Sequence, residues 1–158
     1  MPKDILYTQI RAMQIDKKTK TRYLKYLTQY EQVDIREGEE WRSIEVAPNY
    51  SVSNFGRIKH NVTNTVRITG MNSQRQNIYS YIAVGLNGKV YRLAVIVATA
   101  FCKKLPAFVK LGIPLFVDHI NGDTKNNRAD NLQWVTSSIN NRLSRMRKNG
   151  ENTRLDIE

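Results

Sequence analysis

The order of apolar and polar stretches in residues 115–148 constrains the fold of this chain more than any other feature. A short apolar run, Leu115-Phe116-Val117, precedes a polar loop, and a second short run covers residues 132–135. A capping residue, Thr136 or Ser137, then precedes a stretch in which apolar residues recur at helical spacing. The segment therefore predicts strand, loop, strand and helix.

Residues 41–91 predict a small antiparallel sheet. Their short, partly alternating segments are 41–47, 50–53, 57–60, 65–69, 78–86 and 89–91. Asn87-Gly88 lies between two apolar runs and predicts a hairpin, since a type I′ turn needs two residues with positive φ. Residues 91–104 predict one buried helix, because Leu93, Val97 and Phe101 recur at helical spacing.

The N-terminal residues 1–38 combine apolar side chains at helical spacing with many basic ones, and predict two short helices. We interpret their aromatic stripe, which includes Tyr23 and Tyr30, as packing rather than base stacking. The sequence thus predicts an α+β fold with a helical segment, a β-rich module, a ββα unit and a loose tail. The corresponding ranges are 1–38, 39–90, 91–150 and 151–158.

The charge of the chain favours a polyanionic partner. There are 25 Lys and Arg residues against 14 Asp and Glu, which gives a formal net charge of +11 and a pI near 9.9. Nucleic acid is the first candidate, whereas charge alone leaves a merely soluble basic protein or an anionic membrane surface open. No apolar run is long enough to span a bilayer, and the polar start is unlike a signal peptide, so we expect a cytoplasmic protein.

The single cysteine, Cys102, excludes an intramolecular disulfide and a zinc site built from several cysteines. It ends an apolar run, where an inert, buried thiol is expected rather than a nucleophile.

Asp118-His119, at the end of the first predicted strand of 115–148, is the candidate reactive pair. Successive strand residues point to opposite faces, but a bend at a strand end can let both reach one site. A helix packed across the hairpin would bring Asn140 near both. Carboxylate and amide oxygens suit Mg²⁺ or Mn²⁺, and a neutral imidazole can take a proton from an attacking water.

The stretch from Val117 to Asn140 resembles the HNH motif of phage and intron-encoded homing endonucleases. The residues that carry the likeness are Val117-Asp118-His119-Ile120-Asn121-Gly122-Asp123 and Asn126 to Thr136, with the spacing to Asn140. This resemblance implies a ββα-metal fold and a DNA endonuclease. It implies that His119 is the general base, that Asp118 and Asn140 bind one divalent metal ion, and that Asn131 braces the loop and holds the His119 ring. Asparagine at position 140, where many HNH enzymes have histidine, implies Mg²⁺ or Mn²⁺.

A second resemblance covers residues 39–59, whose Tyr50-Ser51-Val52-Ser53-Asn54-Phe55-Gly56-Arg57-Ile58 is similar to a module that often precedes HNH domains. It implies a small sheet that lies against DNA, with contacts from Arg57, Lys59, Arg67, Gln74, Arg75 and Gln76. Tyr91 replaces a histidine of relatives, whereas Arg92 remains and is a candidate phosphate contact. The last helix adds Arg142, Arg145, Arg147 and Lys148.

The sequence is compatible with three classes of function. The first is a metal-dependent DNA endonuclease that acts on double-stranded DNA as a monomer, which would nick, or as a homodimer, which would cut both strands. The alternative is a DNA-binding regulator with a degenerate HNH site. A third class, a protein-interaction module, would use the aromatic helices of residues 1–38.

Overall fold

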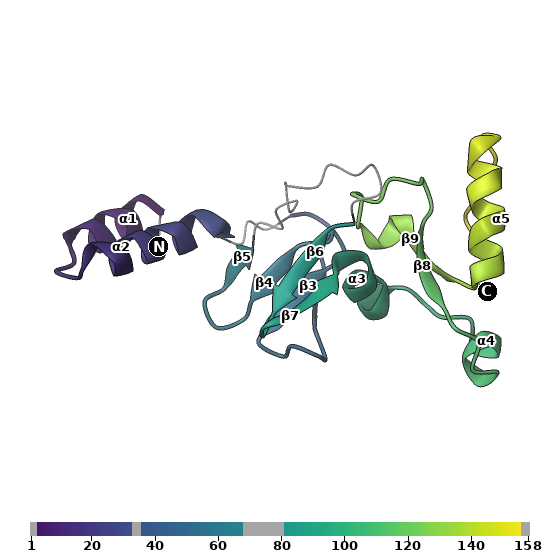
Figure 1. Ribbon diagram of the computed structural model, residues 1–158, viewed down its shortest axis with the longest axis horizontal. Coiled ribbons are helices and arrows are strands. Elements are labelled where there is room, and N and C mark those ends of the chain that lie inside the picture. The colour runs from purple at the N-terminus through teal and green to yellow at the C-terminus, as the bar shows by residue number, and fades with distance from the viewer. Residues whose placement is uncertain (1–2, 33–35, 68–80, 156–158) are drawn as a thin grey trace.

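The computed structural model describes residues 3–32, 36–67 and 81–155. The fold is mixed α and β with antiparallel strands, as predicted (Figure 1). The helices are α1 (Lys3–Ala12), α2 (Lys17–Gln29), α3 (Leu93–Phe101), α4 (Pro106–Lys110) and α5 (Ser137–Lys148). The strands are β1 (Tyr30–Gln32), β2 (Trp41–Ser43), β3 (Tyr50–Ser53), β4 (Ile58–His60), β5 (Thr65–Arg67), β6 (Ala83–Leu86), β7 (Lys89–Arg92), β8 (Phe116–His119) and β9 (Leu132–Val135). Within these ranges no helix has the length and apolar character needed to cross a bilayer.

Five strands of the described chain form one antiparallel sheet in the order β1-β5-β4-β3-β2. Strands β2 to β5 follow one another along the chain, and Val52 of β3 pairs with Ile58 of β4. Both side chains are fully buried. They anchor the sheet to the hydrophobic core around α3.

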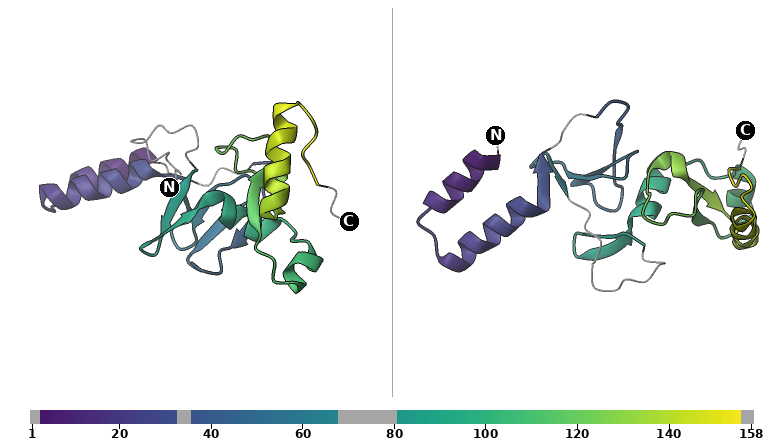
Figure 2. Two further views of the ribbon diagram at one scale, coloured as in Figure 1. Left: turned by 45° about the vertical axis from the view of Figure 1, so that its right-hand side comes forward. Right: turned by 90° about the horizontal axis from the view of Figure 1, so that it is seen from above.

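Strand β1 was not expected, because Tyr30 continues the helical spacing of the preceding aromatic residues. The structure instead ends α2 at Gln29 and pairs Glu31 with Val66 of β5. The open edge of β5 offers unpaired backbone groups, and a local residue pattern does not encode a pairing partner so distant in sequence. The α1–α2 hairpin lies at one end of the molecule and α5 at the other (Figure 2).

The β6–β7 hairpin confirms the predicted turn. Asn87 and Gly88 have φ values of 49° and 78°, and Leu86 pairs with Lys89 across them. The hairpin is a separate two-stranded sheet, so the single sheet expected over residues 41–91 is wrong in this respect.

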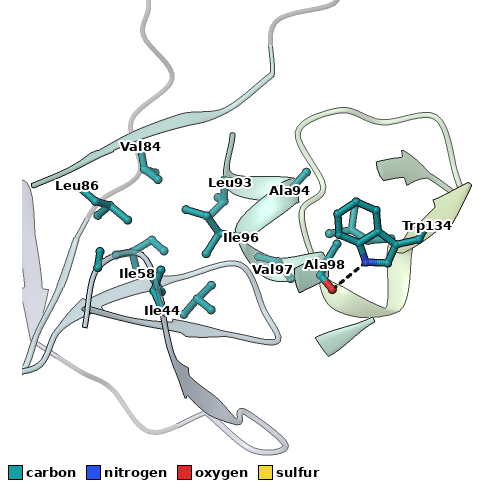
Figure 3. Close-up of a cluster of buried hydrophobic side chains, with 13 residues drawn as sticks. Ile44, Ile58, Val84, Leu86, Leu93, Ala94, Ile96, Val97, Ala98 and Trp134 are labelled. Atoms are coloured by element: carbon teal, nitrogen blue, oxygen red, sulfur yellow. Dashed lines mark hydrogen bonds between the residues drawn. The ribbon is translucent and has the colours of Figure 1, made fainter. Parts of the chain in front are cut away.

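Helix α3 is the centre of the hydrophobic core. Its residues Leu93, Val97 and Ala98 are at most 2% exposed. The core around it contains Ile44 and Ile58 from the sheet region, Val84 and Leu86 from β6, and Trp134 from β9 (Figure 3). The indole nitrogen of Trp134 donates a hydrogen bond to the Ala98 carbonyl at 3.1 Å. One continuous core therefore joins the sheet to the β8–β9 hairpin. The helix is shorter than the predicted 91–104, because Cys102 is already extended.

The inert thiol expected at Cys102 agrees with its surroundings, although the residue is partly rather than fully buried. Its thiol lies 3.5 Å from the Ala129 carbonyl oxygen and 3.4 Å from that of Leu132. Burial raises the pKa of the thiol to about 11, so it stays protonated at neutral pH.

The C-terminal segment corrects the expectation of a loose tail over residues 151–158, as far as residue 155. Thr153 is 3% exposed, and its hydroxyl donates to the Ile120 carbonyl. The side-chain amide of Gln133 forms two hydrogen bonds with the backbone of this segment. Its Nε2 donates to the Thr153 carbonyl, and its Oε1 accepts from the Leu155 amide. A side chain thus acts as a strand partner, which no hydrophobic pattern reveals. Helix α4, a single turn and a half that begins at Pro106 after the extended Leu105, was also not predicted from the sequence.

A buried ion pair supports the β3–β4 turn. The guanidinium of Arg57 donates from Nε to Oε1 of Glu39 at 2.8 Å and from Nη2 to Oε2, and the two side chains are 10% and 2% exposed. Burial raises the pKa of Glu39, but the hydrogen bonds from Arg57 and Ser53 and the charges of Arg57 and Arg36 outweigh it, so the pKa lies below its usual value.

We expect Glu39→Gln to destabilise the fold by about 3 kcal/mol at neutral pH, because it leaves the Arg57 charge buried without its anion. A depressed carboxyl pKa contributes stability that is present above the usual glutamate pKa and is lost as the pH falls through the folded-state pKa. Urea unfolding at a series of pH values should therefore show a difference from the unchanged protein that shrinks in acid. Glu40→Gln is the control, since the Glu40–Arg42 pair is exposed at 3.8 Å. An equal loss in both variants would contradict a specific role for the buried pair.

Candidate active site

The β8–β9 hairpin separates the two members of the candidate pair. Asp118 pairs with Gln133 and His119 with Leu132, so both lie inside regular antiparallel strands. Side chains alternate along a strand, and the partners of the two residues differ accordingly. Asp118 contacts α5, whereas His119 lies on the other face with Leu132. No bend turns them to one side, as the sequence had allowed.

The carboxylate of Asp118 is 4% exposed and accepts three hydrogen bonds. Gln133 donates to Oδ2 at 2.9 Å. Arg147 of α5 donates to Oδ2 at 3.1 Å and to Oδ1 at 2.5 Å. Burial raises the pKa of Asp118 above its usual value, while the hydrogen bond from Gln133 and the charge of Arg147 act against this rise. A bidentate guanidinium therefore balances the carboxylate and fixes its orientation.

Helix α5 presents Asn140 toward the same side of the hairpin. Thr136 caps the helix, accepting a hydrogen bond from the Ile139 amide, as one of the two predicted caps. Asn140, Leu143 and Arg147 recur at a spacing that places them on one face of a helix. Leu143 is buried and Arg147 contacts Asp118, so this face is the one that packs on the hairpin. The side chain of Asn140 is partly buried and makes no hydrogen bond within the described ranges.

The donor set that Asp118 and Asn140 offer fits a hard divalent cation in kind, since both supply oxygen atoms. The described residues contain no group of three or more His, Cys, Asp or Glu side chains that could hold a metal ion. A cation at this place would take one or two ligands from the protein and the rest from water and phosphate, as Mg²⁺ commonly does. It would also have to share or replace the contact between Arg147 and Asp118.

The imidazole of His119 is held by the loop between β8 and β9 rather than by α5. The ring is 5% exposed, and Nε2 lies 3.0 Å from Oδ1 of Asn127. The Nδ2 of Asn127 donates to the Lys125 carbonyl, which can only accept, so Oδ1 must face the imidazole. Nε2 therefore carries the ring proton of the neutral form, and the lone pair is on Nδ1.

Aromatic and basic side chains surround the His119 ring. The ring of Tyr81 lies beside it, with centroids 6.1 Å apart and planes inclined by 35°. The Arg92 guanidinium lies over the Tyr81 ring, 4.6 Å from its centroid. Arg92 is exposed and has no carboxylate partner among the described ion pairs.

Asn131 braces the loop between the two strands. Its Oδ1 accepts from the Asn121 amide, and its Nδ2 donates to Oδ1 of Asn121 and to the Asn126 carbonyl at 2.9 Å each. The residue that contacts the His119 ring is Asn127, four residues earlier. The resemblance assigned both roles to Asn131. In the structure Asn131 braces the loop, and Asn127 holds the His119 ring.

Comparisons with known proteins agree with this geometry. Residues 110–142 match the family model of HNH endonucleases. The chain carries an HNH endonuclease domain. The uncharacterized HNH endonuclease L247 of Acanthamoeba polyphaga mimivirus is 36% identical over 112 residues, covering 66% of this chain and 26% of that protein. A solved structure of DNA binding and cleavage by the HNH homing endonuclease I-HmuI matches with a TM-score of 0.52 and 26% identity, over 75% of this chain and 62% of that one.

The HNH domain and its neighbouring sheet carry several of the basic residues proposed from sequence as DNA contacts. Arg142 and Arg145 are exposed on α5, and Lys59 lies 4.6 Å from the Trp41 ring centroid on the sheet. Arg57 is a correction, because its side chain is only 10% exposed and its guanidinium is paired with the Glu39 carboxylate. The backbone of Arg67 is in β5, but its side chain lies outside the described part of the structure, as do Gln74, Arg75 and Gln76 entirely.

Sequence reasoning missed four side chains around the HNH site, namely Asn127, Gln133, Arg147 in its contact with Asp118, and Tyr81. The register of two strands would have placed Gln133 opposite Asp118, because the loop length fixes which residues pair. Helical spacing from Asn140 would likewise have put Arg147 on the inner face rather than among the solvent-facing basic residues. Nothing in the sequence distinguishes Asn127 from its neighbour Asn126 as the partner of His119.

Proposed function

We propose that this protein is a metal-dependent endonuclease that hydrolyses phosphodiester bonds of double-stranded DNA. The observation that carries the proposal is the fixed His119 ring, protonated at Nε2 by its contact with Asn127, inside a matched HNH domain. A buried imidazole with a defined free lone pair is the arrangement that a general base requires. The same family membership and the basic charge of the chain support DNA as the substrate.

The reaction needs a proton acceptor and a place for negative charge. Nδ1 of His119 takes a proton from a water whose oxygen attacks the phosphorus atom. The bond from phosphorus to the leaving oxygen breaks as the new bond forms, and that oxygen takes a proton from solvent water to give a free hydroxyl. The imidazolium then returns its own proton to solvent. The hydrogen bond from Nε2 to Asn127 steadies the imidazolium that forms, much as an orienting group does for other histidine bases.

Asp118 and Asn140 would hold one Mg²⁺ or Mn²⁺ ion. Such an ion, when bound, would supply stabilisation of the negative charge on the phosphate. For His119 to act on the same phosphate, the DNA backbone would have to lie across the end of the hairpin, because the two side chains leave its opposite faces. Asp118 supplies the only anionic oxygens of this set, and its strand position is fixed by Gln133. Asn131 keeps the loop after His119 in shape through Asn121 and Asn126, so its contribution is to position rather than to react.

DNA contacts are proposed for the exposed residues Arg92, Arg142 and Arg145 and for the partly buried Lys59, with Arg67 and Arg75 remaining predictions from sequence. Arg142 and Arg145 lie on the helix that carries Asn140, so a strand held there would lie near the proposed metal site. Arg92 contacts the ring of Tyr81, which in turn lies beside His119. A single site breaks one strand per encounter, so a monomer nicks DNA and a homodimer cuts both strands.

The test is incubation of the full chain with supercoiled plasmid in Mg²⁺ or Mn²⁺. We expect relaxed or linear product, no product when EDTA is present, and recovery when the metal is added back in excess. Tight DNA binding that needs no metal, together with no cleavage of plasmid or genomic DNA, would overturn the proposal in favour of a DNA-binding regulator. Cleavage that survives EDTA would overturn its metal dependence.

A further inference from the structure

The turn between β3 and β4 touches the loop that holds His119. The Ala129 amide donates to the Asn54 carbonyl at 2.8 Å. The Arg128 guanidinium lies 4.1 Å from the centroid of the Phe55 ring. A Cβ placed on Gly56 would lie 2.9 Å from the carbonyl oxygen of Asn127. The sheet therefore meets the HNH loop at three consecutive positions on each side.

Gly56 is needed at this contact for two separate reasons. Its φ of 78° is a conformation that side chains rarely adopt. The close neighbour is also backbone, since the Asn127 carbonyl carbon would lie 3.2 Å from the same Cβ. A flexible side chain could move aside, but a backbone carbonyl moves only with its loop. Any added atom at Gly56 must therefore shift Asn127.

The turn itself is held rigidly. Ser53 is fully buried, and its hydroxyl accepts from the Phe55 and Arg57 amides. The side chain of Asn54 accepts from the Glu40 amide and donates to the Gly38 carbonyl. These bonds fix the turn independently of the loop that it touches. The core around α3 further holds the sheet and the β8–β9 hairpin together (Figure 3).

Asn127 connects this contact to the chemistry, because its Oδ1 is the atom within 3.0 Å of Nε2 of His119. The bonds of the Asn131 side chain reach Asn121 and Asn126 and do not include Asn127. The position of Asn127 is thus set on one side by the braced loop and on the other by the turn.

We propose that the turn Ser53–Arg57 is a positioning element of the active site, which presses on Asn127 and so keeps the His119 ring protonated at Nε2 with Nδ1 available as the base. Gly56 and Asn127 are positioning residues that act through His119. The β-rich module is then a structural part of the catalytic apparatus as well as a surface for DNA. This inference rests on the proposed role of His119.

The Nε2-bound proton of His119 gives a direct test by NMR of protein labelled with ¹⁵N at histidine. The chain has only two histidines, so His60 serves as an internal reference. We compare Gly56→Ala with Gly88→Ala, because both glycines have a φ of 78° but nothing lies within 4 Å of a Cβ at Gly88. The two variants therefore share backbone strain and differ in the contact.

We expect the unchanged protein and Gly88→Ala to show a slowly exchanging Nε2 proton of His119. In Gly56→Ala its exchange with water should be at least about tenfold faster, because the hydrogen bond to Asn127 opens. In cleavage assays kcat should fall about 10- to 100-fold in Gly56→Ala with KM little changed. Wild-type exchange of this proton in a folded Gly56→Ala protein would overturn the proposal.

If Gly56→Ala does not fold, Phe55→Ala replaces it, since it removes the ring beneath Arg128 without adding an atom. Faster exchange of the His119 proton supports the proposal, and unchanged exchange overturns it. The measured quantity is the exchange rate of the Nε2 proton of His119, so the test can also be made on a protein that cuts no DNA. Failure of the proposed nuclease function and failure of the positioning role are therefore distinguishable.

Discussion

Substitution of His119 by alanine should lower the rate of plasmid cleavage by about 10²- to 10⁴-fold, the usual contribution of a positioned general base. The variant keeps Asp118, Asn140 and the exposed basic residues, so DNA binding should stay close to that of the unchanged protein. The measurement is single-turnover cleavage with enzyme in excess over plasmid, paired with a binding isotherm on the same DNA without metal.

The matched control for His119→Ala is His60→Ala, since these are the only histidines of the chain. The His60 ring packs edge-on against Tyr50, with centroids 5.0 Å apart, and accepts from the Thr63 amide. Both contacts lie within the five-stranded sheet and the turn that follows β4, so loss of the His60 ring should leave the cleavage rate nearly unchanged. Removing a buried ring also leaves a cavity, so thermal unfolding must first show that His119→Ala is folded. Undiminished cleavage by the folded variant would reject His119 as the base.

The candidate site could be predicted in part from sequence because its proposed residues lie close together along the chain. Asp118, His119, Asn131 and Asn140 fall within a strand, a loop and one helix, whose order and lengths set their approximate positions. The pairing of His119 with Asn127 was not readable. It depends on the contact between the loop that contains Asn127 and the β3–β4 turn at Gly56. These two segments are about seventy residues apart in the sequence.

The fold was readable where local patterns decide it. Asn87-Gly88 specifies its turn through the φ values that it tolerates, and the apolar run of α3 specifies a buried helix. Strand β1 and the docked segment at Thr153 depend instead on backbone partners supplied by β5 and by Gln133. Such pairings are decided by tertiary proximity, so a hydrophobic period cannot reveal them. The burial of Arg57 was hidden for the same reason, since its partner Glu39 lies in a different segment.

Replacement of Arg147 by glutamine should tighten the binding of Mn²⁺ in the absence of DNA by about tenfold while it lowers the stability of the metal-free fold. Arg147 engages both carboxylate oxygens of Asp118, at 2.5 and 3.1 Å. A cation that binds Asp118 has to displace these contacts, and about 1.4 kcal/mol of competition corresponds to a factor of ten in affinity. Loss of the guanidinium leaves the carboxylate buried without its counter-charge, at a cost of about 3 kcal/mol.

Tighter Mn²⁺ binding together with lower stability of the metal-free fold would show that Arg147 competes with the metal for Asp118. Free Mn²⁺ is followed by electron paramagnetic resonance during titration, and stability by urea unfolding without metal. Arg145→Gln, on the same helix but exposed, should change neither quantity appreciably, whereas Asp118→Asn should remove the high-affinity binding. If Arg147 only supported the site, its loss would weaken metal binding and stability together.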